Sequence, residues 1–198
     1  MSVVVVKLGV GNTASVMFAL ERIGAKARLT ADPREIAEAG RVIFPGVGAA
    51  AFAMEKIGSG GLKCALTEFP RPLLGICLGH QLLFERSEEG GVEALGLLEG
   101  EVKRLAASID RPVPHMGWSR LAILEASPLL EGVKSGDYCF FVHSYAAPVN
   151  EWTIASADYG GAFAAVVNRG NVYGCQFHPE RSGETGQRIL SNFLALPC

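Results

Sequence analysis

The sequence lacks the features that mark membrane-spanning and nucleic-acid-binding proteins. Its uncharged apolar stretches are short, and none approaches the ~20 residues that a transmembrane helix needs. Residues 1–8 form too short an apolar run for a signal peptide and have no basic flank. The net charge is −2, from 18 Lys and Arg against 20 Asp and Glu, with no long run of either sign. We therefore expect a cytoplasmic protein with neither a membrane nor a nucleic acid as its partner.

Cysteine pairs at disulfide or metal-binding spacing are also missing. The five cysteines are odd in number, widely spaced and without a Cys-x-x-Cys pair: Cys64, Cys77, Cys139, Cys175 and Cys198. No pair of histidines has metal-ligand spacing on one expected element. Neither a disulfide framework nor a metal site is predicted. The 198 residues, 49% of them hydrophobic, are long enough to form a core by apolar burial alone.

In the first half of the chain, short apolar segments alternate with segments of helical periodicity. The expected strands are residues 3–8, 27–30, 41–44 and 73–76. The expected helices are residues 13–23, a capped helix starting near residue 33, residues 49–68 with a break at 58–61, and residues 81–86. Such alternation is typical of a parallel sheet with helices on both faces.

The second half changes to strand-like segments separated by turn residues. These segments are residues 97–105, 118–124, 138–145, 152–157, 163–168 and 171–177, followed by an amphipathic helix at 185–196. Because short consecutive strands with tight turns pair antiparallel, we predict an α/β fold whose mostly parallel central sheet gains antiparallel strands. No repeat or long linker divides the chain, so residues 1–198 are predicted to form a single domain.

The segment Gly-Ile-Cys-Leu-Gly at residues 75–79 lies between an expected strand and an expected helix. It matches a nucleophile elbow with Cys77 as the nucleophile, because the tight turn requires small flanking residues. The N–H of Leu78 is then placed to face an oxyanion. The same five residues would also suit a buried structural cysteine in a tight turn.

A nucleophilic cysteine needs a base and a group that orients the base. In Phe-His-Pro-Glu at residues 177–180, Glu180 can hold one nitrogen of His178 while the other faces the thiol. Alone, this segment would suit a polar strand end; beside the cysteine elbow it predicts a catalytic triad. Val47 and Gly48 follow the strand at 41–44, where parallel sheets bind ligands, and they are predicted to offer a second oxyanion donor. The alternative for these two residues is an ordinary turn.

Together these residues resemble the class I, or triad, glutamine amidotransferases. Within that family the chain is most similar to the glutaminase subunit of imidazole glycerol phosphate synthase. The similarity runs nearly end to end and is carried by residues 75–90, 113–118, 141–145 and 176–186. That subunit usually has methionine at the position of His80, whereas Leu-Gly-His-Gln is common in glutaminases such as that of anthranilate synthase, which is the alternative assignment. A regulatory subunit that has lost its triad would also suit this type of fold, but the intact Cys77, His178 and Glu180 count against it. A cysteine peptidase or a stress-related chaperone on a related sheet is another alternative, but it would lack Gln81, Glu89 and the His178-x-Glu180 order.

The resemblance implies both a reaction and a set of residues. Cys77, His178 and Glu180 would hydrolyse glutamine to glutamate and ammonia through a glutamyl thioester, without metal or organic cofactor. Residues similar to those that hold glutamine are Gln81, Glu89, His143, Ser144 and Tyr145. The ammonia would pass to a (β/α)8-barrel cyclase subunit, which makes imidazole glycerol phosphate and an aminoimidazole carboxamide ribonucleotide in histidine biosynthesis. Asn12 and Trp118 are expected at the interface of that heterodimer.

Overall fold

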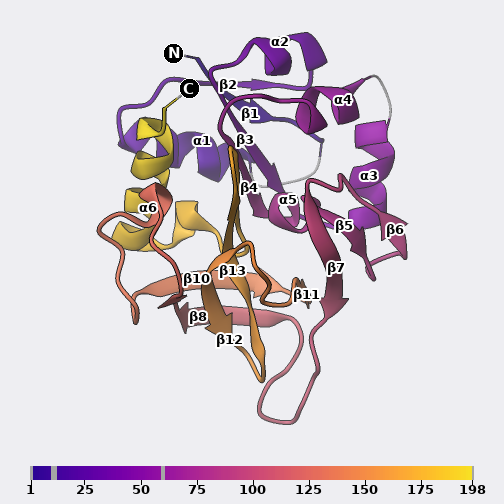
Figure 1. Cartoon of the computed structure of the whole chain (residues 1–198), viewed down its shortest axis with the longest axis vertical. Helices are drawn as coiled ribbons and strands as arrows, with labels where there is room; N and C mark the ends of the chain where they lie inside the picture. Colours follow the sequence, from indigo (N-terminus) through magenta and orange to yellow (C-terminus); the bar gives the residue numbers. More distant parts are fainter. Residues whose placement is uncertain (1, 10–12, 59–60, 198) are drawn as a thin grey trace.

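An eight-stranded sheet forms the centre of the computed structural model, which describes residues 2–9, 13–58 and 61–197 (Figure 1). The strand order is β2-β1-β3-β4-β14-β13-β12-β9. The strands are β2 (Ala27–Thr30), β1 (Val3–Val6), β3 (Arg41–Gly46), β4 (Leu73–Cys77), β14 (Val172–Cys175), β13 (Ala162–Arg169), β12 (Thr153–Asp158) and β9 (Ala122–Ile123). The first five run parallel and the last three extend the sheet antiparallel. The predicted fold class is confirmed.

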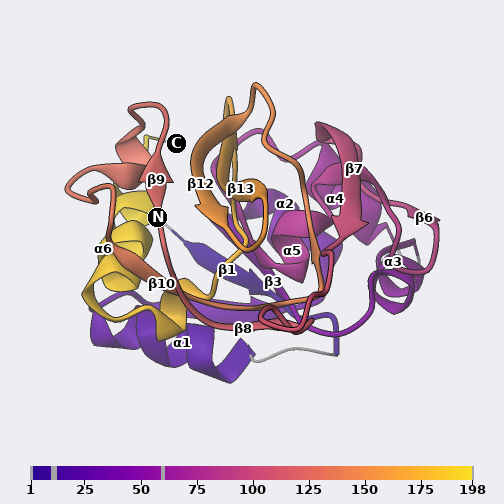
Figure 2. The same ribbon diagram turned by 90° about the horizontal axis from the view of Figure 1, so that it is seen from below.

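Helices cover both faces of this sheet because its inner strands are apolar on both sides. In β1, Val3 and Val5 pack on one face with α1 (Thr13–Arg22) and α6 (Gly183–Ala195). Val4 and Val6 pack on the other face with α2 (Pro33–Glu38), α3 (Ala50–Gly58) and α4 (Leu62–Thr67). Figure 2 shows α1 and α6 together on one side of the sheet. Burying each such side chain stabilises the fold by roughly 1.5–3 kcal/mol. Among the described residues, no helix is long and apolar enough to span a membrane.

The helix predicted at residues 81–86 is wrong. The helix α5 covers only Leu78–Gln81, and the chain then forms strand β5 (Phe84–Ser87). This strand pairs in parallel with β7 (Leu98–Arg104) and antiparallel with β6 (Val92–Glu93), and β7 also pairs with β11 (Tyr145–Ala146). Phe84 is fully buried in the core. Pairing with β7 and burial of this ring outweigh the helix propensity of the segment.

A two-stranded ribbon lies across the carboxyl end of the parallel strands (Figure 1). It consists of β8 (His115–Arg120) and β10 (Tyr138–His143), which pair antiparallel. The continuous strands predicted at residues 118–124 and 138–145 are each divided between two sheets, because β9 joins the central sheet and β11 joins β7. Two short 3-10 helices, η1 (Pro128–Leu130) and η2 (Pro179–Arg181), pack against α6.

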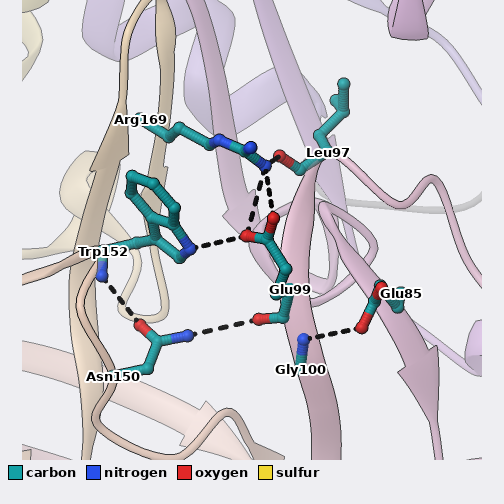
Figure 3. A network of polar contacts seen from close by, with 7 residues as sticks. All are labelled: Glu85, Leu97, Glu99, Gly100, Asn150, Trp152 and Arg169. Atoms are coloured by element: carbon teal, nitrogen blue, oxygen red, sulfur yellow. Dashed lines mark hydrogen bonds and ion pairs between the residues drawn. The ribbon is translucent and has the colours of Figure 1, made fainter.

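A polar cluster ties β7 to the central sheet, as Figure 3 shows. The indole Nε1 of Trp152 donates to the Glu99 carboxylate at 2.7 Å, and Arg169 Nη1 lies 3.2 Å from the same carboxylate. The Arg169 guanidinium also stacks 4.6 Å from the centre of the Trp152 ring. Asn150 Nδ2 donates to the Glu99 carbonyl at 3.2 Å. The cluster lies near the start of β7, and β11 pairs with the other end of that strand, with Tyr145 opposite Arg104.

Candidate active site

Cys77 sits in a strained turn where β4 meets α5. It has φ 55° and ψ −108°, and it is the one non-glycine residue with positive φ among those that the structure describes. A Cβ on Gly75 would lie 2.7 Å from the Gly79 carbonyl oxygen, and a Cβ on Gly79 would lie 1.8 Å from the Phe44 carbonyl oxygen. Both flanking positions therefore require glycine. Such backbone strain costs roughly 1–3 kcal/mol and is typical of functional sites.

His178 and Glu180 form a buried pair beside this turn. The distance from His178 Nδ1 to Glu180 Oε1 is 2.8 Å, and the two side chains are 8% and 2% exposed. His178 itself is extended, with φ −98° and ψ 96°, and η2 begins at the next residue. The backbone of His178 is held on both sides: its N–H donates to the Phe140 carbonyl, and its carbonyl accepts from Ser182 Oγ. The imidazole is thus fixed before any ligand binds.

Cys77 and Glu180 control the charge of this imidazole. Burial alone would lower the pKa of His178, but the hydrogen bonds and charges of Cys77 and Glu180 outweigh burial and raise it to about 10. Glu180 occupies Nδ1, so Nε2 is the nitrogen available to the sulfur. His178 therefore carries a positive charge at neutral pH and can stabilise a thiolate at Cys77.

A cavity of about 320 Å³ opens over Cys77, within the size range of small-molecule sites. Its lining contains ten of the residues predicted from sequence: Val47, Gly48, Cys77, Leu78, Gln81, Glu89, His143, Ser144, Tyr145 and His178. Glu180 lies behind His178, and Trp118 lies outside the cavity on β8 with 53% of its surface exposed. Asn12 lies outside the described residues.

Three further residues line the cavity that the sequence did not identify as site residues: Pro114, Val142 and Arg181. All three fall within the segments 113–118, 141–145 and 176–186, so their location in those motifs was the available signal. Val142 is half-buried and lines the cavity next to His143 on β10. Its carbonyl oxygen lies 3.7 Å from Cys77 Sγ.

Gln81 and Glu89 are each anchored by hydrogen bonds within the protein. Gln81 Nε2 donates to the Tyr145 carbonyl at 2.7 Å and to Gln176 Oε1 at 3.1 Å, so Oε1 remains the acceptor of that side chain. Glu89 Oε2 accepts from the Ala50 N–H at 2.8 Å. Because Ala50 opens α3, Glu89 also satisfies one of the N–H groups at the start of that helix. This structural role was not evident from the sequence.

Cys64, Cys139, Cys175 and His80 do not line this cavity. Burial raises the pKa of Cys139 to about 12 and that of Cys175 well above the usual range, while Cys64 is exposed on α4. His80 is fully buried beside Phe84, and burial lowers its pKa to about 3. In the described part of the chain, no three His, Cys, Asp or Glu residues lie close enough together to hold a metal ion.

Comparison with known proteins gives consistent matches along the whole chain. The family model for glutamine amidotransferase class-I matches residues 4–196. The imidazole glycerol phosphate synthase subunit HisH of Xylella fastidiosa is 52% identical over 194 residues, which cover 98% of this chain and 97% of that protein. HisH of Vibrio vulnificus is 44% identical over 200 residues, covering 98% of each chain.

Solved structures with lower identity share the fold. A glutamine amidotransferase superposes with a TM-score of 0.75 at 22% identity, with 97% of each chain covered. PurLQS from Thermotoga maritima has a TM-score of 0.73 at 21% identity, covering 98% of this chain and 97% of its own. At these identities the likeness concerns the arrangement of helices and strands.

Proposed function

This chain belongs to the class I glutamine amidotransferases, and from that membership we propose that it hydrolyses glutamine as the glutaminase subunit of an imidazole glycerol phosphate synthase. The observation that carries the proposal is the cavity that places Cys77, in its strained turn, beside the His178–Glu180 pair. A glutaminase of anthranilate synthase is the second candidate. It has less support, because the HisH subunits of two organisms match this chain along nearly its whole length at 44% and 52% identity.

In the proposed reaction, the Cys77 thiolate attacks the side-chain amide carbon of glutamine. The C–N bond then breaks, and ammonia leaves with the proton that His178 held. In the resulting thioester, the sulfur no longer carries the charge that raises the pKa of His178. The imidazole is then neutral and takes a proton from the attacking water. Cleavage of the thioester restores the thiolate and the imidazolium, and glutamate is released.

The oxyanion of the tetrahedral intermediate would be bound by backbone N–H groups. Leu78 is the first residue of α5, where helix N–H groups have no partner within the helix. Val47 and Gly48 line the other side of the cavity, and Gly48 has φ 104°, a conformation that glycine adopts without strain. We propose that a peptide of this loop turns its N–H toward the oxyanion when a partner binds.

The charged ends of glutamine would be held at the opposite end of the cavity from the sulfur. Gln81 Oε1 and the Glu89 carboxylate are acceptors suited to an α-ammonium group. His143, Ser144 and Tyr145 form the adjacent wall, and the Ser144 carbonyl is anchored by the Leu105 N–H. This arrangement requires no cofactor for the reaction.

Glu89→Gln should raise the glutamine KM about 5- to 20-fold with a smaller change in kcat. Removing the charge weakens binding of the substrate ammonium, while the remaining amide oxygen still accepts from Ala50. Steady-state kinetics of glutamine hydrolysis measures both KM and kcat. Glu85→Gln, on the exposed part of β5, is the matched control and should keep the wild-type KM. An unchanged KM in Glu89→Gln would remove Glu89 from the proposed glutamine site.

We further propose that a (β/α)8-barrel cyclase subunit covers the mouth of the cavity and receives the ammonia. On β8, Met116 and Trp118 are 67% and 53% exposed, and this strand directly follows Pro114, which lines the cavity. Exposed large apolar side chains next to a site suit an interface, and tryptophan is a frequent anchor. The heterodimer would keep ammonia from being protonated in water and lost.

Glutamine hydrolysis should be slow for the isolated chain and about 10- to 1,000-fold faster with the purified cyclase and its nucleotide ligand. This range corresponds to a competent conformation that is about 0.1–10% populated without the partner. Trp118→Ala should weaken the stimulation, whereas Phe52→Ala, an exposed aromatic on α3, should not. A chain that is fully active alone and indifferent to the cyclase would contradict the assignment to this synthase.

A further inference from the structure

Two buried histidines connect the ribbon to the glutamine cavity. His115 on β8 and His143 on β10 are paired in register, and both are almost completely buried. The distance from His115 Nδ1 to His143 Nε2 is 3.1 Å. His115 Nε2 lies 3.0 Å from Ser119 Oγ, and His143 Nδ1 lies 2.8 Å from the Tyr145 carbonyl oxygen. The four groups form a continuous row of hydrogen bonds.

The direction of every bond in this row follows from its last member. A carbonyl oxygen only accepts, so His143 Nδ1 carries the proton and Nε2 of the same ring is an acceptor. His115 must then donate from Nδ1, and its Nε2 accepts from the hydroxyl of Ser119. Burial lowers the pKa of each imidazole to about 4, which keeps both rings neutral and this pattern intact at physiological pH.

The row continues from the Tyr145 carbonyl to the nucleophile. The same carbonyl oxygen accepts from Gln81 Nε2, which also donates to Gln176 Oε1. Gln176 Nε2 in turn lies 4.0 Å from Cys77 Sγ. The orientation of the Gln81 amide therefore depends on where the Tyr145 carbonyl is held, and His143 holds it.

We propose that His115 is a positioning residue for substrate capture, which acts through His143 and the Tyr145 carbonyl to aim the Gln81 amide at the cavity. This inference rests on the proposed glutaminase function. His115 is not among the residues that line the cavity, so it does not touch the substrate. Its ring is held between Tyr159, stacked at 4.0 Å, and Phe141, at 5.2 Å, so Nδ1 keeps a fixed direction toward His143.

His115→Phe keeps the ring stacking and removes the donor. It should raise the glutamine KM about 5- to 30-fold, the effect of one misdirected buried hydrogen bond, and change kcat by less than about threefold. His115→Asn places an amide N–H near the position of Nδ1 and should restore most of the affinity. Tyr159→Phe is the matched control, since it keeps the stack and loses only a hydrogen bond to the Pro112 carbonyl.

A second readout does not depend on activity. With 15N-labelled histidine, NMR should show His143 as the Nδ1–H tautomer in the wild-type chain, with Nε2 accepting a hydrogen bond. In His115→Phe, the Nε2 signal should move because its donor is gone. If the wild-type chain failed to hydrolyse glutamine, the proposed function would fail, while this spectrum would still test the hydrogen-bonded row.

Two results would overturn the role of His115. One is a glutamine KM and a His143 Nε2 signal that are both unchanged in His115→Phe. The other is a parallel loss of kcat, affinity and thermal stability in His115→Phe and His115→Asn alike, because that outcome would indicate general unfolding of the ribbon. The positioning role of His115 is supported if His115→Asn restores the glutamine KM and Tyr159→Phe keeps the wild-type KM.

Discussion

Cys77→Ser should lower the glutamine kcat by at least about 10⁴-fold while leaving the fold intact. Oxygen replaces sulfur in a turn whose geometry is set by backbone contacts of Gly75 and Gly79, so the structure has no reason to change. The hydroxyl is a far weaker nucleophile, because His178 can stabilise a thiolate but cannot generate an alkoxide at neutral pH. Glutamine hydrolysis with the cyclase present and the thermal midpoint of unfolding are the two measurements.

Cys64→Ser is the matched control for this substitution. Cys64 is exposed on α4, remote from the cavity, so the same exchange of sulfur for oxygen should leave kcat at the wild-type value. A Cys77→Ser chain that retained more than a tenth of the wild-type turnover would show that the nucleophile is another group. In that case the strained backbone of Cys77 would need a different explanation.

The elbow could be predicted from sequence because its determinants are local. Gly75 and Gly79 flank Cys77 within five residues, so the motif is visible in the sequence. The Gly79 carbonyl within the turn requires glycine at residue 75, whereas the Phe44 carbonyl on the neighbouring strand β3 requires glycine at residue 79. The alternating first half of the chain likewise predicted the parallel sheet, since strands such as β1 are apolar on both faces. Both features are predicted by patterns that extend over only a few residues.

The features that sequence did not predict depend on contacts between distant segments. The segment at residues 81–86 has good helix formers, but β7 supplies a pairing partner that no local pattern reveals. The row from His115 to the Tyr145 carbonyl requires the register of β8 on β10, strands whose paired histidines are 28 residues apart. From sequence, His143 was expected to hold glutamine, but nothing linked it to His115.

Glu180→Gln is expected to lower the glutamine kcat about 10²- to 10⁴-fold, less than loss of His178 itself. An amide can present either its oxygen or its N–H to Nδ1, so the correct tautomer of His178 is no longer enforced. The carboxylate charge that helps to raise the pKa of His178 is lost as well, while burial still lowers it. Both effects make His178 a poorer base and reduce its stabilisation of the Cys77 thiolate.

Titration of His178 by NMR tests this physical cause directly. In the wild-type chain the raised pKa means that the imidazole stays charged as the pH rises through neutrality and loses its proton only near pH 10. In Glu180→Gln the transition should move to lower pH, since one of the two groups that favour the charged form is gone. Cys77→Ser should move it in the same direction, because the sulfur is the other group. If the His178 transition stayed near pH 10 in Glu180→Gln, a different acid would have to hold the imidazole, and Glu180 would lose its place in the triad.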